Sequence, residues 1–131
     1  MEVYVLDTHG LLWFLTQSPK ISLLARQILR DAENSSKQVF IPTIVLAELD
    51  NIIRKKGLDL TINEVLQKII NSDGFSIVPF DLGVFQIMLT LPNQIEIHDR
   101  IIVATTIYYE AKLITRDEIL RNFDQIETVW D

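Results

Sequence analysis

One nearly continuous apolar segment constrains the fold of this chain more than any other feature. Residues 101–109 are apolar apart from two threonines, which predicts a helix buried on more than one face. Residues 113–115 then predict a short buried strand. Asp99 stands at the start of the expected helix and Asp117 just after the strand. Since these two places lie at the same edge of a parallel α/β sheet, the segment predicts two neighbouring carboxylates.

The rest of the chain alternates between short apolar segments and longer segments with helical periodicity. The segments expected to be strands are residues 2–7, 39–41, 75–78, 113–115 and 127–130. The segments expected to be helices are residues 11–15, 23–31, 44–56, 62–71, 81–92, 101–109 and 118–121. This alternation predicts an α/β fold with a mostly parallel central sheet of four to five strands, covered on both faces. The length of 131 residues fits a single domain over residues 1–131.

Composition excludes several classes of protein. The chain has no cysteine, so it has neither disulfides nor thiolate metal sites. No apolar segment reaches membrane-spanning length, and no targeting pattern precedes the first strand, so we expect no membrane contact and a cytoplasmic location. A net charge of −6 argues against a generally phosphate-binding surface. Any contact with nucleic acid must be local or carried by a metal ion.

Three aspartates fall at the same edge of the expected sheet, although each has an ordinary structural explanation. Asp7, after the first strand, suits a turn. Asp99 suits a helix N-cap that contributes about 1 kcal/mol. Asp117 suits the cap of the short helix that follows it. Their convergence on one edge favours a common site over three separate structural roles.

Glu48 is a fourth candidate, from the helix expected over residues 44–56. It shares a helical stripe with Ile44 and Ile52, and a carboxylate among apolar residues is unfavourable unless it has a partner. Asp50 differs, because Arg54 lies four positions further on and predicts a surface ion pair.

Carboxylates gathered in one pocket require a cation. Each close pair repels by up to roughly 4 kcal/mol at an intermediate dielectric constant, so isolated carboxylates would take up protons. A hard divalent cation relieves that repulsion, and ligation by oxygen alone favours Mg²⁺ or Mn²⁺ over zinc. Such a site can activate water and stabilise a phosphodiester during displacement.

Five segments stand out by their order and spacing: LDTHGLLWFL (residues 6–15), VLAEL (45–49), HDRIIVATT (98–106), LITRDEIL (113–120) and ETVW (127–130). Taken together they resemble the PIN-domain nucleases, in particular VapC-like toxins of toxin–antitoxin pairs. The resemblance covers nearly the whole chain. It implies a three-layer α/β/α sandwich and a metal-dependent endoribonuclease that hydrolyses single-stranded RNA with Mg²⁺ or Mn²⁺.

The family's catalytic and metal-binding acids carry over to Asp7, Glu48, Asp99 and Asp117. This chain departs from many relatives at residues 96–98, where they have a proline- and aspartate-containing run. A further acidic or amide ligand after the fourth acid stays open among Glu118, Asn122 and Asp124.

The resemblance also implies partners, namely a homodimeric toxin and a cognate antitoxin. We expect the antitoxin to have a basic tail whose arginine competes with the metal for the acidic pocket. Apolar grooves near residues 11–15 and 52–53 are expected to hold a helical antitoxin segment.

Four residues beside the acids are candidates for substrate binding. Thr8 and Thr115 could hydrogen-bond a phosphate, or serve only as β-forming residues. Arg100 and Arg116 could hold an RNA phosphate, although ion pairs with the adjacent acids are the favoured expectation.

The histidines and the large aromatic residues are expected to have structural or solvent-facing roles. His9 and His98 are expected to be solvated rather than general bases. Trp13, Phe14 and Trp130 are expected in the core or in a dimer contact.

Two other classes of protein share this fold pattern. A receiver-like phosphoacceptor domain would need a second acid after Asp7, an aspartate after the third strand and a lysine at position 116. The chain has Thr8, Pro79 and Arg116 there. A non-catalytic interaction domain with a PIN fold would be expected to lack one of the four acids, and all four are present.

Overall fold

The computed structural model describes residues 2–131, and its centre is one five-stranded sheet. The strand order is β3-β2-β1-β4-β5, and all four pairings are parallel. The strands are β1 (Val3–Leu6), β2 (Gln38–Pro42), β3 (Phe75–Val78), β4 (Lys112–Ile114) and β5 (Glu127–Val129). The predicted parallel sheet is therefore confirmed.

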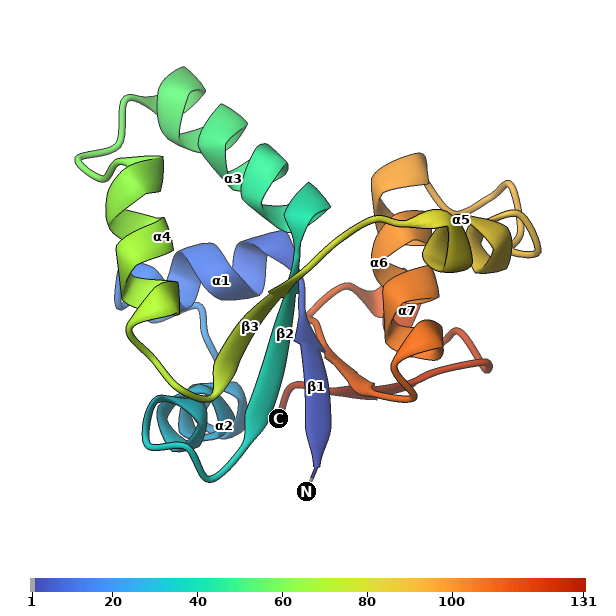
Figure 1. Cartoon of the computed structure of the whole chain (residues 1–131), viewed down its shortest axis with the longest axis horizontal. Helices are drawn as coiled ribbons and strands as arrows, with labels where there is room; N and C mark the ends of the chain where they lie inside the picture. Colours follow the sequence, from blue (N-terminus) through green and yellow to red (C-terminus); the bar gives the residue numbers. More distant parts are fainter. Residues whose placement is uncertain (1) are drawn as a thin grey trace.

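Helices cover both faces of the sheet, as Figure 1 shows. They are α1 (Thr8–Leu15), α2 (Leu23–Glu33), α3 (Thr43–Lys56), α4 (Ile62–Ile70), α5 (Leu82–Met88), α6 (Ile97–Tyr108) and α7 (Glu118–Arg121). The first four lie on one side and the last three on the other. The expected three-layer α/β/α sandwich is confirmed. No helix within residues 2–131 combines the length and apolar character needed to cross a bilayer.

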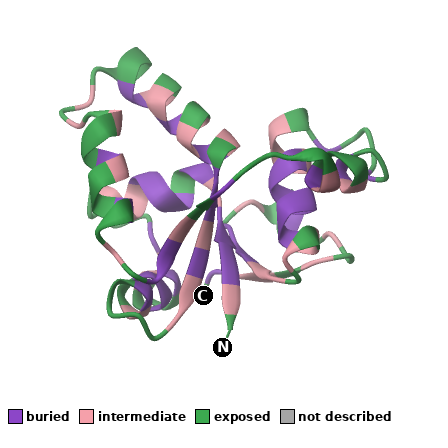
Figure 2. Cartoon of the chain, viewed as in Figure 1, coloured by how far each residue is buried: buried purple, intermediate pink, exposed green. Residues whose placement is uncertain are grey.

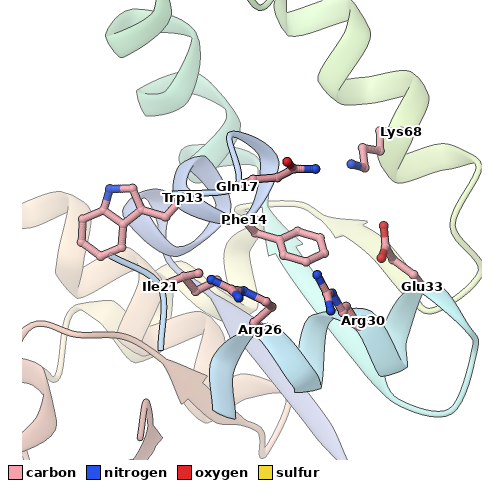
Figure 3. Close-up of a pocket in the computed structure, with 8 residues that line it drawn as sticks. All are labelled: Trp13, Phe14, Gln17, Ile21, Arg26, Arg30, Glu33 and Lys68. Carbon is pink, nitrogen blue, oxygen red and sulfur yellow. The ribbon is translucent and has the colours of Figure 1, made fainter. Parts of the chain in front are cut away.

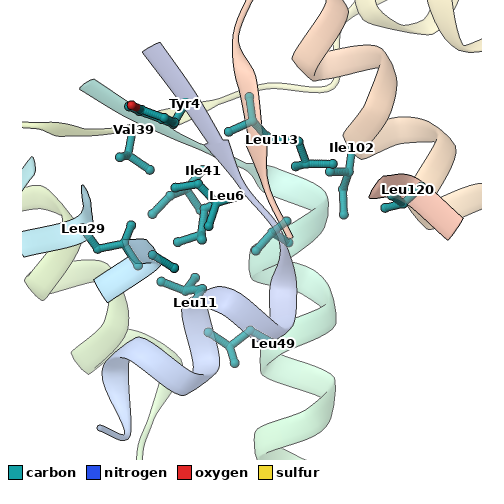
Figure 4. Packing of buried hydrophobic residues seen from close by; sticks show 14 of the residues in the cluster. Tyr4, Leu6, Leu11, Leu29, Val39, Ile41, Leu49, Ile102, Leu113 and Leu120 are labelled. Carbon is teal, nitrogen blue, oxygen red and sulfur yellow. The ribbon is translucent and has the colours of Figure 1, made fainter. Parts of the chain in front are cut away.

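The core lies on both sides of the sheet, because every central strand is covered twice. Val5 and Leu6 of β1 are fully buried, and so are most residues of the apolar stretch of α6. Figure 2 shows this burial along the strands and α6, with the exposed residues on the outer helix faces. In Figure 4, Leu29 and Leu49 pack from one layer, while Ile102 and Leu120 pack from the other. The prediction of a helix buried on several faces is confirmed.

The chain order produces a topological switch beside β1, and this positions the site. After β1 the chain adds β2 and β3 on one side, then returns to add β4 and β5 on the other. In open parallel sheets the crevice at such a switch, outside the carboxyl ends of the strands, is where ligands bind. The first residue after β1 is Asp7, and Thr115 follows β4.

Two helix starts differ from the sequence-based expectation. Helix α1 begins at Thr8 rather than residue 11, because the Asp7 side chain caps it directly. Helix α6 begins at Ile97, and its N-cap is Glu96. The N-cap role considered for Asp99 is therefore wrong, since Asp99 lies within the first turn of the helix.

Candidate active site

A cavity of about 470 Å³ opens at the carboxyl edge of the sheet. It is lined by five carboxylates together with polar, aromatic and apolar residues. The carboxylates are Asp7, Glu48, Glu96, Asp99 and Asp117, and the other residues are Thr8, His9, Trp13, Ile52, Ile102 and Arg116. The structure therefore brings the four predicted acids together, although they come from separate parts of the chain.

Asp7 is fixed by the turn from β1 into α1. Its Oδ1 accepts a hydrogen bond from the Gly10 amide at 2.9 Å. A Cβ on Gly10 would lie 2.9 Å from that oxygen and 2.8 Å from Leu6 Cδ1, so a larger residue would have to displace the Asp7 or Leu6 side chain. Burial raises the pKa of the Asp7 carboxyl, against the lowering effect of hydrogen bonds from Thr115 and Gly10.

Glu48 reaches the cavity from α3 and has the partner that its position requires. Its Oε1 accepts a hydrogen bond from the Thr8 hydroxyl at 2.7 Å, and Thr8 is buried. Its Oε2 lies 3.9 Å from Nδ1 of His98. Thr8 therefore uses its proton to orient Glu48, which ties α1 to α3 across the site.

Asp99 is the carboxylate most affected by its neighbours. Burial raises its pKa to about 6, with further contributions from repulsion by Asp117, Glu96, Glu48 and Asp7. Within the described chain, no side-chain or backbone donor hydrogen-bonds its carboxylate. Asp99 is thus a partly buried acid without a hydrogen-bond donor to its carboxylate, and the charges of the other four acids all raise its pKa.

Asp117 connects the end of β4 to α7. Its Oδ1 accepts a hydrogen bond from the Ile119 amide at 2.8 Å and so caps α7, as the sequence suggested. Its own amide donates to Thr115 Oγ1 at 3.1 Å. Thr115 is fully buried and does not line the cavity, so the structure gives it a positioning role within the turn.

Glu96 also lines the cavity, although the sequence did not indicate it as a site residue. Its carboxylate accepts hydrogen bonds from the His98 amide at 2.9 Å and the Asp99 amide at 3.4 Å, and it pairs with the His98 ring at 2.6 Å. Burial pushes its pKa up, but these hydrogen bonds from His98 and Asp99 outweigh it and lower the pKa. The available signal was an acid three residues before Asp99, in the segment that departs from the relatives.

The two arginines do not form the expected ion pairs. Arg116 lies over the Trp13 ring, 5.4 Å from its centroid, at the cavity rim. Arg100 does not line the cavity, and its buried Nε has no hydrogen-bond partner. Neither arginine pairs with an acid in the part of the chain that is described. The ion-pair expectation is wrong, and only Arg116 is placed to meet a ligand in the cavity.

The remaining polar candidates also differ in whether they line the cavity. His9 lines the cavity and packs on Trp13 at 5.5 Å, whereas His98 is held by Glu96 rather than by solvent alone. None of the three residues considered as a further ligand lines the cavity; these are Glu118, Asn122 and Asp124.

The carboxylates fit a hard divalent cation in donor type and in charge. All the candidate donors are oxygens, and their mutual repulsion is what a cation would relieve. Nevertheless, among residues 2–131 no three His, Asp or Glu side chains stand close enough together to hold a metal ion as they lie. Ligation therefore requires cavity side chains to rotate from the conformations that they adopt here.

These features define a class of protein: a parallel α/β sandwich with carboxylates gathered at the switch of its sheet. Residues 4–126 match the PIN domain family, and the chain belongs to that family. No curated protein sequence gives a significant match.

Several solved structures share the fold. VapBC2 from Rickettsia felis, bound to a DNA fragment from its promoter, matches with a TM-score of 0.74 and 19% identity over 98% of this chain and 99% of that chain. A toxin–antitoxin complex from Klebsiella pneumoniae matches with a TM-score of 0.67 and 21% identity, over 96% and 95% of the two chains. FitAcB from Neisseria gonorrhoeae matches with a TM-score of 0.68 and 20% identity, over 95% of each chain.

Proposed function

We propose that this PIN domain is a metal-dependent endoribonuclease that hydrolyses phosphodiester bonds of single-stranded RNA. The observation that carries this proposal is the single cavity lined by acids from four separate segments, in which the pKa of Asp99 is raised to about 6. Accumulated negative charge without internal neutralisation is the electrostatic signature of a cation site. Membership of the PIN family sets aside the receiver-like alternative.

In this proposal Asp7, Glu48, Asp99 and Asp117 hold Mg²⁺ or Mn²⁺, directly or through water. The ion would supply positive charge for the phosphate and a lowered pKa for the attacking water. Thr8 keeps Glu48 oriented toward the cavity. Arg116, which lies over the Trp13 ring, would contact a phosphate oxygen.

Cleavage of a mixed pool of single-stranded RNA tests the mechanism. We expect cleavage with Mg²⁺ or Mn²⁺, none with EDTA, and none by Asp99→Asn. Asp50→Asn is the matched control, because Asp50 pairs with Arg54 at 3.0 Å and does not line the cavity. Undiminished cleavage in EDTA would refute the metal mechanism, and absence of cleavage with every metal would favour a non-catalytic interaction domain.

We further propose that the protein is the toxin of a toxin–antitoxin pair and acts in the cytoplasm. The fold likeness to toxins in antitoxin complexes supports this, as does a carboxylate cavity suited to a cationic side chain. A basic antitoxin tail should inhibit by competing with Mg²⁺, so inhibition should weaken as Mg²⁺ rises. Inhibition that does not depend on Mg²⁺ or on the tail's arginines would place the antitoxin elsewhere.

The expected apolar antitoxin grooves are only partly present. Leu11, Leu12 and Ile53 are buried in the core, so they offer no groove. Ile52 lines the carboxylate cavity itself. Over α1 the surface is hollowed, but cationic side chains line the hollow beside Trp13 and its neighbours.

We also propose a homodimer, and an exposed apolar patch supports it. Large apolar side chains are exposed on and beside α5, and patches of this kind mark interaction surfaces. They are Phe80, Leu82, Phe85, Leu89 and Tyr108. Some of these side chains are in contact: the Phe80 and Phe85 rings lie 6.1 Å apart, and the Tyr108 ring lies against Gly83 of α5.

A further inference from the structure

A second cavity, of about 480 Å³, lies over α1, α2 and α4 and is unlike the first in charge. We call it the cationic groove; its lining residues are Trp13, Phe14, Gln17, Ile21, Arg26, Arg30, Glu33 and Lys68. We propose that the cationic groove binds the backbone of the single-stranded RNA on one side of the cleaved phosphate. This inference rests on the proposed nuclease function and adds a substrate path to it.

The charge of the groove is the first argument. Arg26, Arg30 and Lys68 face it from two helices, against the single acid Glu33. Figure 3 shows these side chains around Phe14, with Arg26, Arg30 and Glu33 on α2 and Lys68 on α4. None of the three cations belongs to an ion pair in the described part of the chain. Unpaired cations gathered in one hollow of a chain with net charge −6 form a local anion-binding surface.

Aromatic side chains in the groove are the second argument. Trp13 and Phe14 are both partly exposed, and cations lie close to each of them. Lys68 Nζ is 5.8 Å from the Phe14 centroid, and Lys20 Nζ is 5.9 Å from that of Trp13. Aromatic faces alternating with cations are how proteins bind single strands without reading sequence, because every base can stack and every phosphate is anionic.

Continuity with the carboxylate cavity is the third argument. Trp13 lines both cavities, and Arg116 of the first cavity lies over its ring. A strand with its scissile phosphate among the acids can therefore pass Arg116 and Trp13 and enter the groove. A long RNA would then meet cations from Arg116 to Lys68, which explains how a protein with a net negative charge could hold RNA.

The test compares two double variants that each remove two positive charges, together with one single variant that removes one. Arg26→Gln with Arg30→Gln changes the groove, and Lys68→Gln changes it from a different helix. Lys55→Gln with Lys56→Gln is the control, because these exposed lysines end α3 and line neither cavity.

Binding is measured by fluorescence anisotropy with a labelled 12-nucleotide single-stranded RNA, in an Asp99→Asn background that does not cleave. If two phosphate contacts are lost, Kd should rise roughly 5- to 20-fold and the salt dependence of log K should fall by about 1.4. The control pair should change Kd less than about two-fold. In cleavage assays with Asp99 intact, the groove variants should raise KM, by a factor that grows with RNA length.

The outcomes separate this inference from the nuclease proposal. Absence of both cleavage and RNA binding in the wild type would remove the proposed function itself. If the wild type cleaves and the groove variants bind RNA like the control pair, only the groove inference is overturned. Groove variants that keep RNA affinity but lose binding of the cognate antitoxin would reassign the groove to a protein partner.

Discussion

Replacing Asp99 with asparagine should stabilise the metal-free protein at neutral pH. The folded-state pKa of Asp99 is raised from 3.8 to about 6 by burial and by four neighbouring carboxylates. Because the folded state then binds the proton more tightly than the unfolded state, this carboxyl favours folding below about pH 4. That contribution is lost as pH rises through about 6.

The size of the effect follows from the pKa difference. A rise from 3.8 to about 6 corresponds to about 3 kcal/mol, which solvent screening of this half-exposed group reduces to about 2 kcal/mol. Removing the charge also loses a favourable interaction with the N-terminal end of α6, worth roughly 0.3–1 kcal/mol. No capping hydrogen bond is lost, since Glu96 is the cap. The net expectation for Asp99→Asn is about 1 kcal/mol of added stability at pH 7, or a Tm higher by about 2–6 °C.

Urea unfolding of both proteins in EDTA, between pH 4 and pH 7.5, checks this prediction. The two stabilities should converge near pH 4 and separate as pH rises through about 6. Asp50→Asn, which removes a surface charge with a single ion pair, should show no such gain. Added Mg²⁺ should stabilise the wild type more than the variant. A variant that melts well below the wild type in metal-free buffer at pH 7 would show that Asp99 has a structural role and that the repulsion argument is mistaken.

Three further predictions concern side chains around the acids and the apolar patch. Gly10→Ala should displace the Asp7 carboxylate, because the new Cβ would stand 2.9 Å from its Oδ1; we expect at least a ten-fold loss of RNA cleavage and a lower Tm by calorimetry. Thr8→Val should release Glu48 and reduce cleavage by about 10- to 100-fold with an unchanged circular dichroism spectrum, whereas Thr8→Ser should restore most of it. Phe85→Glu should convert a dimer to a monomer in light scattering while leaving the Tm of the monomer nearly unchanged; a dimer that persists would place the interface elsewhere.

The site acids whose positions follow from local sequence patterns could be predicted from the sequence. Asp7 and Asp117 follow from the rule that parallel strands end at one edge. Glu48 follows from its helical stripe, and its buried partner was expected although its identity, Thr8, was not. These predictions depend only on local pattern and fold class, so a single sequence suffices for them.

Other parts of the site depend on contacts that local pattern does not encode. Glu96 was missed because glutamate is not a preferred N-cap and an exposed acid before a helix is ordinary. The contact of Arg116 with Trp13 joins residues a hundred positions apart, and the pairing with adjacent acids expected from sequence neighbours did not form. The cationic groove could not be predicted from the sequence. The net charge of −6 gave no indication of a basic surface, and Arg30 and Lys68 come to line one cavity only in the folded chain.

Three of the cavity acids are also helix caps, and this determines which substitutions can reveal their function. Asp7 caps α1, Glu96 caps α6 and Asp117 caps α7, so helix geometry holds each carboxylate in place. Alanine at such a position would remove a cap worth about 1 kcal/mol together with the charge, and the two losses would be confounded. Asparagine at position 7 or 117 keeps an acceptor oxygen for the cap while removing the negative charge. Cleavage lost in Asp117→Asn with the Tm preserved would therefore assign that carboxylate to the chemistry of the cavity, whereas an equal loss of both would assign it to the helix.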